Sequence, residues 1–179
     1  MTDDDDDYVD QYFVGLEALA KAEGIETETL RRLVLAGLLP LPSYLRSDGT
    51  EMVPRDWLAL AQQAGGVEHL PTWFGTQFDD PAMARQAWED YLSGQYVCLR
   101  EISPTAIKRK HELCSEITSV IGNPRPDSAE WLDSLHELVD ELDALEPPFA
   151  PYDRLRFGGP LSRDQLITDV RRRFPVRAA

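Results

Sequence analysis

The stretch 16–60 constrains the fold of this chain most, because its helix and turn signals follow one another in a distinctive order. Apolar residues at helical spacing lead to a break at Gly24, and a second amphipathic helix begins near Thr27. That helix ends in a Gly-Leu-Leu-Pro stop, and the Ser-Asp-Gly turn within 45–53 predicts a β-hairpin. Pro54 then stands where a helix tolerates proline best, in its first turn. The sequence therefore predicts two helices, a hairpin and a third helix.

This order resembles the MerR-type winged helix, a DNA-binding module in which a helix pair precedes a β-wing. The resemblance predicts a winged helix-turn-helix over residues 11–66. Its landmarks are Leu19-Ala20, Gly24-Ile25, Thr29-Leu30-Arg31, Gly37-Leu38-Leu39-Pro40, Gly49 and Pro54-Arg55-Asp56-Trp57-Leu58. The side chains that would face DNA are Arg31, Arg32, Arg46 and Arg55.

The charge of this module departs from that of the family it resembles. In the family, an aromatic residue and an Arg follow the glycine of the wing, whereas this chain has Thr50 and Glu51. A glutamate directed at a phosphate reverses the sign of a contact that normally adds affinity. The whole chain carries a formal charge of −14, which also repels a phosphate backbone. We therefore expect the module to pack or to bind a ligand, with DNA binding as the alternative.

Helical patterns dominate the rest of the chain, so we predict a mostly α fold. Residues 1–10 hold six Asp and no basic residue, which is typical of a disordered, solvated tail. Four regions are expected: a disordered acidic tail over 1–10, a winged-helix-like module over 11–66, a helical domain over 67–148, and an Arg-rich Gly-Gly-Pro loop with a C-terminal helix packed on the body over 149–179.

Composition excludes several classes of protein. No apolar run approaches the roughly 18 residues that a membrane span needs. Two cysteines among 179 residues are too few for a disulfide framework, so we expect a cytoplasmic protein. No nucleotide-binding glycine pattern occurs, and we predict neither a cofactor nor a metal site. The sequence leaves the oligomeric state open.

A glycine-rich loop near the C-terminus is the strongest candidate for a ligand site. Its two glycines free the backbone to turn N–H groups toward an anion, and arginines grip a carboxylate or phosphate through two hydrogen bonds. The candidate anion-binding residues are Arg154, Arg156, Gly158, Gly159, Ser162 and Arg163. The alternative is that this basic segment docks on the acidic helix expected over 127–145 of the same chain.

Other constellations carry weaker signals. His136-Glu137-x-x-Asp140 falls short of a His-Glu-x-x-His zinc motif, and Cys114 near His111 sits in an apolar pattern. Aromatic residues in the middle of the chain suit either a pocket wall or ordinary core. If the protein is an enzyme, the polar candidates for catalysis are Arg100, Glu101 and Tyr152, together with Arg154 and Arg156.

The whole chain also resembles a small actinobacterial family associated with natural-product biosynthesis. The matching residues are Leu39-Pro40-Leu41-Pro42-Ser43-Tyr44, Asp48-Gly49-Thr50-Glu51-Met52-Val53-Pro54, Tyr91-Leu92-Ser93-Gly94-x-Tyr96-x-Cys98-Leu99-Arg100-Glu101, Glu141-Leu142-Asp143-Ala144-Leu145-Glu146, Pro148-Phe149-Ala150-Pro151-Tyr152-Asp153-Arg154 and Arg156-Phe157-Gly158-Gly159-Pro160. The resemblance implies a pathway role but supplies no reaction.

Three functions follow as expectations. The first is a cytoplasmic pathway protein that binds, or transforms, a small anionic intermediate. The second is a pathway-specific MerR-like regulator, and the third is a non-catalytic adaptor for a larger biosynthetic enzyme.

Overall fold

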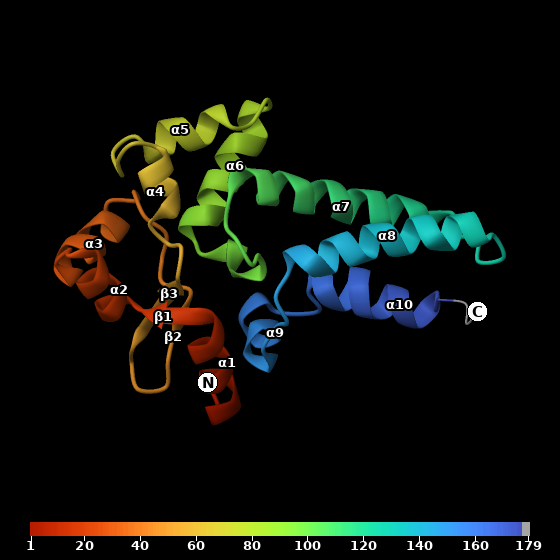
Figure 1. Cartoon of the computed structure of the whole chain (residues 1–179), viewed down its shortest axis with the longest axis horizontal. Helices are drawn as coiled ribbons and strands as arrows, with labels where there is room; N and C mark the ends of the chain where they lie inside the picture. Colours follow the sequence, from red (N-terminus) through yellow and green to blue (C-terminus); the bar gives the residue numbers. More distant parts are fainter. Residues whose placement is uncertain (177–179) are drawn as a thin grey trace. The chain divides into compact units, whose positions relative to one another are not determined.

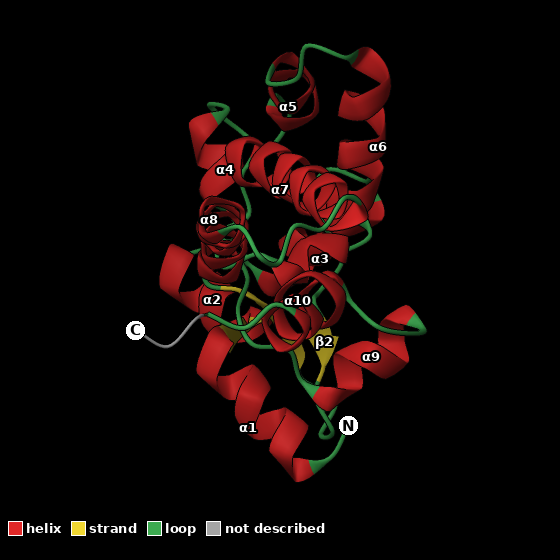
Figure 2. Ribbon diagram, turned by 90° about the vertical axis from the view of Figure 1, so that its right-hand side faces the viewer, coloured by secondary structure: helices red, strands yellow, loops and turns green. Residues whose placement is uncertain are grey.

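A computed structural model describes residues 1–176 of the chain, and it is mostly helical (Figures 1 and 2). The last three residues of the region expected over 149–179 lie outside the described part. In chain order the elements are α1 (Asp3–Tyr12), β1 (Phe13–Gly15), α2 (Leu16–Glu23), α3 (Thr27–Leu35), β2 (Tyr44–Leu45), β3 (Glu51–Pro54), α4 (Ala59–Gln63), α5 (Leu70–Thr76), α6 (Pro81–Leu92), the 3₁₀-helix η1 (Gln95–Cys98), α7 (Pro104–Gly122), α8 (Ala129–Leu145), α9 (Pro151–Phe157), the π-helical segment η2 (Arg163–Thr168) and α10 (Asp169–Arg173).

The chain divides into two compact units. The first comprises Met1–Val97 with Ile102–Pro104, and the second comprises Cys98–Glu101 with the chain from Thr105 onward. The main division therefore falls after Val97, whereas we expected boundaries after residues 66 and 148. Helices α5 and α6 belong to the first unit, and the backbone N–H of Leu41 donates to the carbonyl of Leu92 at the end of α6.

The first unit contains a three-stranded antiparallel sheet with the strand order β1-β3-β2. The hairpin was expected, and Tyr44 pairs with Met52 across it. Strand β1 was not expected, because its residues continue the helical pattern of α2; it pairs Val14 with Val53. Gly24 ends α2 in the left-handed conformation, which lets the chain turn directly into α3.

The expectation of a disordered acidic tail is wrong, because Asp3–Tyr12 forms helix α1. Thr2 and Asp5 form a reciprocal capping box, and acidic residues in a first turn interact favourably with the helix dipole. Val9 is fully buried and anchors the helix. The aspartates therefore start a helix, a role that a count of charges does not distinguish from a solvated tail.

Two local expectations also differ from the structure. Pro54 ends β3 instead of opening a helix, and Pro151 begins α9, where we expected a loop. Both differences occur at a proline, where turn, strand and helix signals overlap.

The second unit has an apolar core between α7, α8 and the C-terminal segment η2–α10. Its fully or nearly fully buried residues are Leu113, Ile117, Leu132, Leu135, Val139, Leu142, Ile167, Val170 and Phe174. Helix α8 confirms the helix expected over 127–145. Within residues 1–176, no helix combines the length and the apolar character required to cross a bilayer.

Candidate functional site

In the first unit, the arginines proposed to face DNA are engaged within the protein. Arg31 donates to the Glu51 carboxylate through Nε at 2.9 Å and Nη2 at 2.7 Å. Glu17 and Glu28 lie within 4.0 Å of the same guanidinium. The hydrogen bonds from Arg31 to Glu51 raise the pKa of Arg31, and its charge is locally cancelled.

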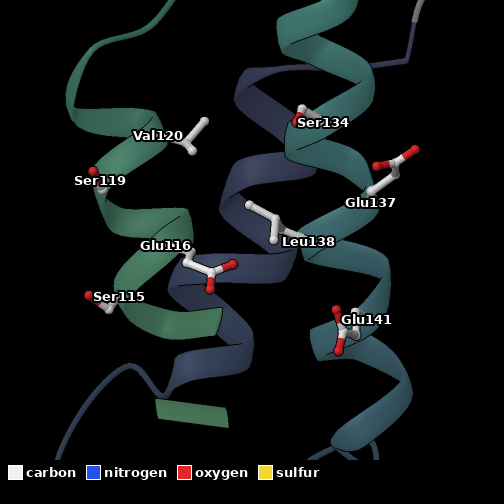
Figure 3. A pocket seen from close by; sticks show the side chains of 8 residues that line it. All are labelled: Ser115, Glu116, Ser119, Val120, Ser134, Glu137, Leu138 and Glu141. Carbon is white, nitrogen blue, oxygen red and sulfur yellow. The ribbon is translucent and has the colours of Figure 1, made fainter. Parts of the chain in front are cut away.

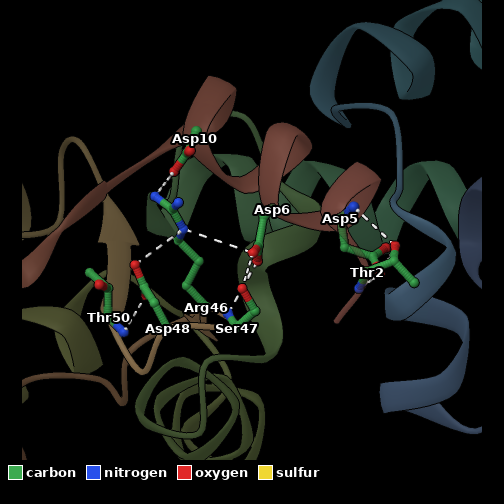
Figure 4. Close-up of polar contacts among 8 residues, drawn as sticks. All are labelled: Thr2, Asp5, Asp6, Asp10, Arg46, Ser47, Asp48 and Thr50. Atoms are coloured by element: carbon green, nitrogen blue, oxygen red, sulfur yellow. Dashed lines mark hydrogen bonds and ion pairs between the residues drawn. The ribbon is translucent and has the colours of Figure 1, made fainter.

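Arg46 is surrounded by carboxylates in the same way (Figure 4). Its Nη1 lies 3.0 Å from Asp10 Oδ1, and its Nε lies 3.9 Å from Asp6 and 3.7 Å from Asp48. Asp6 is itself buried and accepts hydrogen bonds from the backbone and hydroxyl of Ser47. Arg46, one of the arginines predicted to face DNA, thereby holds helix α1 against the hairpin loop.

The other two arginines make weaker contacts. Arg32 donates through Nε to the Glu28 carbonyl at 3.3 Å, and Arg55 donates to the carbonyls of Asp10 and Gln11 at 3.4 Å. A small hollow of about 180 Å³ lies beside Arg31. Its lining residues are Leu16, Glu17, Arg31, Asp48, Gly49, Thr50 and Glu51. Three carboxylates against one arginine make this hollow unfavourable for phosphate.

In the second unit, the predicted anion loop forms the end of a helix. Gly158 adopts the left-handed conformation after α9, and the N–H groups of Gly158 and Gly159 both donate to the Arg154 carbonyl. Arg154 forms a two-pronged pair with Asp164, at 2.9 and 2.6 Å. The hydrogen bonds from Arg154 lower the pKa of Asp164. The loop amides and this guanidinium are therefore already satisfied by the protein.

Arg163 and Arg171 hold the C-terminal segment on α8. Arg163 pairs with Asp143 and donates to the Glu146 carbonyl, and Arg171 bridges Asp140 and Asp143. Burial alone would raise the pKa of Asp143, but hydrogen bonds from Arg171 and Arg163 lower it overall. This is the docking arrangement that the sequence offered as an alternative to an anion site.

The remaining candidates are spread over several elements. Arg100 donates through its backbone N–H to the Leu145 carbonyl and through Nε to the Ala144 carbonyl, so it closes the end of α8. Glu101 is exposed, and Tyr152 is half-buried on α9. Arg156 stacks on the ring of its neighbour Phe157 with its guanidinium carbon 5.1 Å from the ring centre.

The other predicted constellations are structural. His136 Nε2 lies 2.8 Å from the Phe174 carbonyl and thereby contacts the end of α10. Phe74, Trp88 and Tyr91 pack with ring centres 5.3 to 5.5 Å apart, as a core does. Within residues 1–176, no group of three His, Cys, Asp or Glu side chains is placed to hold a metal ion.

A buried polar cluster in the second unit was missed by the sequence analysis. Glu146 is fully buried, and its Oε1 accepts from Lys110 Nζ at 2.8 Å and from Ser162 Oγ at 2.6 Å. Lys110 Nζ also lies 2.8 Å from Cys98 Sγ. The signal was present, because Lys110 falls between Ile107 and the apolar positions that follow on the inner face of α7.

The protonation states of Cys98 and Lys110 indicate that this cluster forms an ion pair and does not supply a nucleophile. Burial raises the pKa of Cys98, so its thiol stays protonated. Burial alone would lower the pKa of Lys110, but the charge of Glu146 and the hydrogen bonds with Cys98 and Glu146 raise it overall, so the ammonium stays charged. A protonated thiol and a charged amine are both poor nucleophiles, and the cluster therefore suits stability better than covalent catalysis.

A second feature missed from the sequence is an open groove of about 640 Å³ between α7 and α8 (Figure 3). Its lining residues are Ser115, Glu116, Ser119, Val120, Ser134, Glu137, Leu138 and Glu141. Val120, Leu138 and Glu116 project into the space between the helices, whereas the serines and Glu137 lie along the rims. The groove thus has an apolar floor with small hydroxyl side chains and carboxylates around it.

Comparisons with known proteins show one match. Residues 59–175 match a family of unknown function, DUF6058, and this range covers more than half of the chain. The matched range includes the groove and the Lys110–Glu146 pair but excludes the elements from α1 to β3. No curated protein and no solved structure matches the chain significantly.

Proposed function

The chain belongs to DUF6058, and we propose that it is a non-catalytic docking protein of a bacterial natural-product biosynthetic pathway. In this proposal its first unit carries a MerR-like winged helix that binds a partner protein instead of DNA. The helix pair α2–α3 followed by the β2–β3 hairpin supports the scaffold. Cys98 and Cys114 are not joined in a disulfide, which is consistent with work in the cytoplasm.

One observation carries the proposal: the arginines that such a scaffold would direct at DNA are neutralised by carboxylates of the same chain. Arg31 is held by Glu51, and Arg46 lies among three aspartates. Binding DNA would require these pairs to break without any gain in net positive charge. Tight association with a duplex is therefore disfavoured on electrostatic grounds.

The helix that would enter the DNA groove also presents an apolar side chain to solvent. Leu35, in the last turn of α3, is 86% exposed. A leucine there provides no hydrogen bond to a base edge or a phosphate, but it suits the core of a protein interface. The anion-binding alternative has less support, because Arg154 and Arg163 are already paired with Asp164 and Asp143.

The docking role is tested by calorimetric titration of the full chain with each enzyme encoded beside its gene. We expect one of these enzymes to bind, and we expect Leu35→Glu to abolish that binding. Leu155→Glu is the matched control, because Leu155 is 80% exposed and lies on α9 of the second unit. Absence of binding to every neighbouring enzyme would overturn the docking role.

The alternative function as a regulator is tested by gel shifts at low salt with the DNA upstream of the gene. We expect no shift for the wild type and weak, salt-sensitive binding for the triple variant E17Q/E28Q/E51Q, which releases Arg31. The control variant D127N/E130Q/D133N changes the net charge equally at exposed positions in the second unit. A sequence-selective shift by the wild type would favour the regulator.

A further inference from the structure

The groove between α7 and α8 occupies the open position of an incomplete helical bundle. Helices α7 and α8 and the segment η2–α10 share one apolar core, and Figure 3 shows η2–α10 behind the α7–α8 pair. The groove opens on the face that this segment leaves uncovered. Val120 and Leu138 remain only partly buried there. A fourth helix along the groove would complete an arrangement that helical proteins use widely.

The side chains along the groove permit a helix to approach closely. Ser115 and Ser119 are one turn apart on α7, and Ser134 lies on α8. Because the distance between packed helix axes depends on the side chains at the contact, small residues allow two backbones to come near each other. The partly buried Val120 and Leu138 provide apolar area between these serines for a matching apolar stripe.

The carboxylates of the groove indicate which charge a bound helix should carry beside its apolar stripe. Glu116 and Glu141 are both bound by Arg109, which forms two 2.6 Å hydrogen bonds with Glu141 and lies 3.4 Å from Glu116. Within residues 1–176, the side chain of Glu137 makes no hydrogen bond or ion pair. The three carboxylates outnumber the single arginine, so the groove favours a positively charged occupant.

Helix α8 already holds a basic segment of the chain, η2–α10, on the flank away from the groove. Arg163 and Arg171, from η2 and α10, pair with Asp140 and Asp143 of α8. The α8 sequence therefore presents carboxylates on two flanks, of which the C-terminal segment of the chain covers one. The groove offers comparable chemistry on the flank that this segment leaves open.

We propose that the α7–α8 groove binds a basic amphipathic helix of a partner protein, with lysines or arginines flanking its apolar stripe. This inference deepens the proposed docking function and rests on it. In this proposal the partner's helix binds to the second unit, whereas the contact expected at Leu35 is on the first unit.

The test uses fluorescence anisotropy with the full chain and a labelled helical peptide of roughly 18 residues built from Ala, Leu and Lys. At low ionic strength we expect binding that weakens as salt is added. A peptide with Gln in place of Lys is expected to bind at least about tenfold more weakly, because the carboxylates then lack partners. Equal binding of the two peptides, or no binding of either, would overturn the proposal.

Two protein variants locate the site. We expect E116K/E137K to weaken binding of the Lys peptide by about tenfold or more, whereas the control E130K/D133K, which changes the net charge equally outside the groove lining, has a small effect. Ser119→Trp blocks the groove without a change of charge and should also reduce binding. Thermal melts followed by circular dichroism establish that each variant is folded.

The outcomes separate this inference from the proposed function. Equal weakening by the groove and control variants would show general attraction to an acidic protein and overturn the groove as the site. If spermidine competed with the peptide at similar affinity, the ligand of the groove would be a small polyamine and not a helix. This result would also overturn the proposal. Peptide binding in the groove, without binding of any neighbouring enzyme, would support the groove while refuting the pathway role.

Discussion

The two units place their charged residues in different environments. In the first unit, Arg31 and Arg46 meet carboxylates at the surface, where water and salt screen the attraction. In the second unit, Lys110 meets Glu146 where the carboxylate is fully buried and both groups have left water. The surface pairs therefore mainly cancel local positive charge, whereas loss of one partner of the buried pair would leave a charge away from water in the second unit.

The largest effect is expected when the buried pair is broken. Lys110→Met leaves Glu146 charged and buried without its partner, and we expect a loss of about 3–5 kcal/mol in the free energy of unfolding. Urea denaturation followed by circular dichroism measures this loss. The double variant K110M/E146L should recover most of it, because no buried charge remains. A loss below about 1 kcal/mol for K110M would show that the pair is hydrated and behaves as a surface pair.

A smaller effect is expected at the aspartates of α1, because this helix carries both a buried and an exposed aspartate. Asp6→Ala removes a buried acceptor of hydrogen bonds from Ser47, and we expect a loss of about 1–3 kcal/mol. Hydrogen exchange over residues 3–12 should accelerate in this variant. Asp7→Ala is the matched control, because Asp7 is exposed on the same helix and should change stability by less than about 0.5 kcal/mol. Equal effects of both variants would contradict specific docking of α1.

The anchoring of the C-terminal segment should depend on pH. The pKa of Asp143 lies below its ordinary value of 3.8, so its stabilising contribution is complete above that value and is lost as the pH falls through the lower folded value. Asp143→Asn should lower the melting temperature at neutral pH, and this difference should shrink progressively as the pH falls below 3.8. Melting curves of both proteins across this range measure the difference. A constant difference at all pH values would exclude titration of Asp143 as the cause.

The smallest effect on stability is expected at the surface pairs. Arg31→Met removes a half-buried guanidinium from Glu51, and the urea midpoint should shift much less than in Lys110→Met. The same replacement at a buried and a partly exposed cation thus compares the two environments directly. An equal shift in both variants would show that the Arg31–Glu51 pair stabilises the first unit as strongly as the buried pair stabilises the second.

Local patterns were sufficient to predict most helices and the hairpin. The turn at Gly24, the Ser-Asp-Gly hairpin and the amphipathic faces of α7 and α8 all depend on neighbours within a few residues, so they can be read from the sequence. The docking of the basic C-terminal segment on α8 was also foreseen as an alternative, because opposite charges were concentrated in those two stretches.

Features that depend on distant partners were not predictable in this way. Helix α1 relies on Ser47 and Arg46 to satisfy Asp6, and strand β1 relies on β3 to pair its backbone. The partners of Lys110 and Glu146 could not be assigned, although a lysine on an apolar helix face was a visible signal. The groove arises only from the spacing between α7 and α8.

The sequence by itself determined the helical class of this protein, its acidic charge and the positions of its main turns, because these follow from residue type and short-range periodicity. Only the tertiary structure decided which arginines are already neutralised, which glutamate is buried and which helical flank stays open. Those properties depend on distances between residues far apart in the chain, and the strength of a charge interaction depends on both distance and exposure to water.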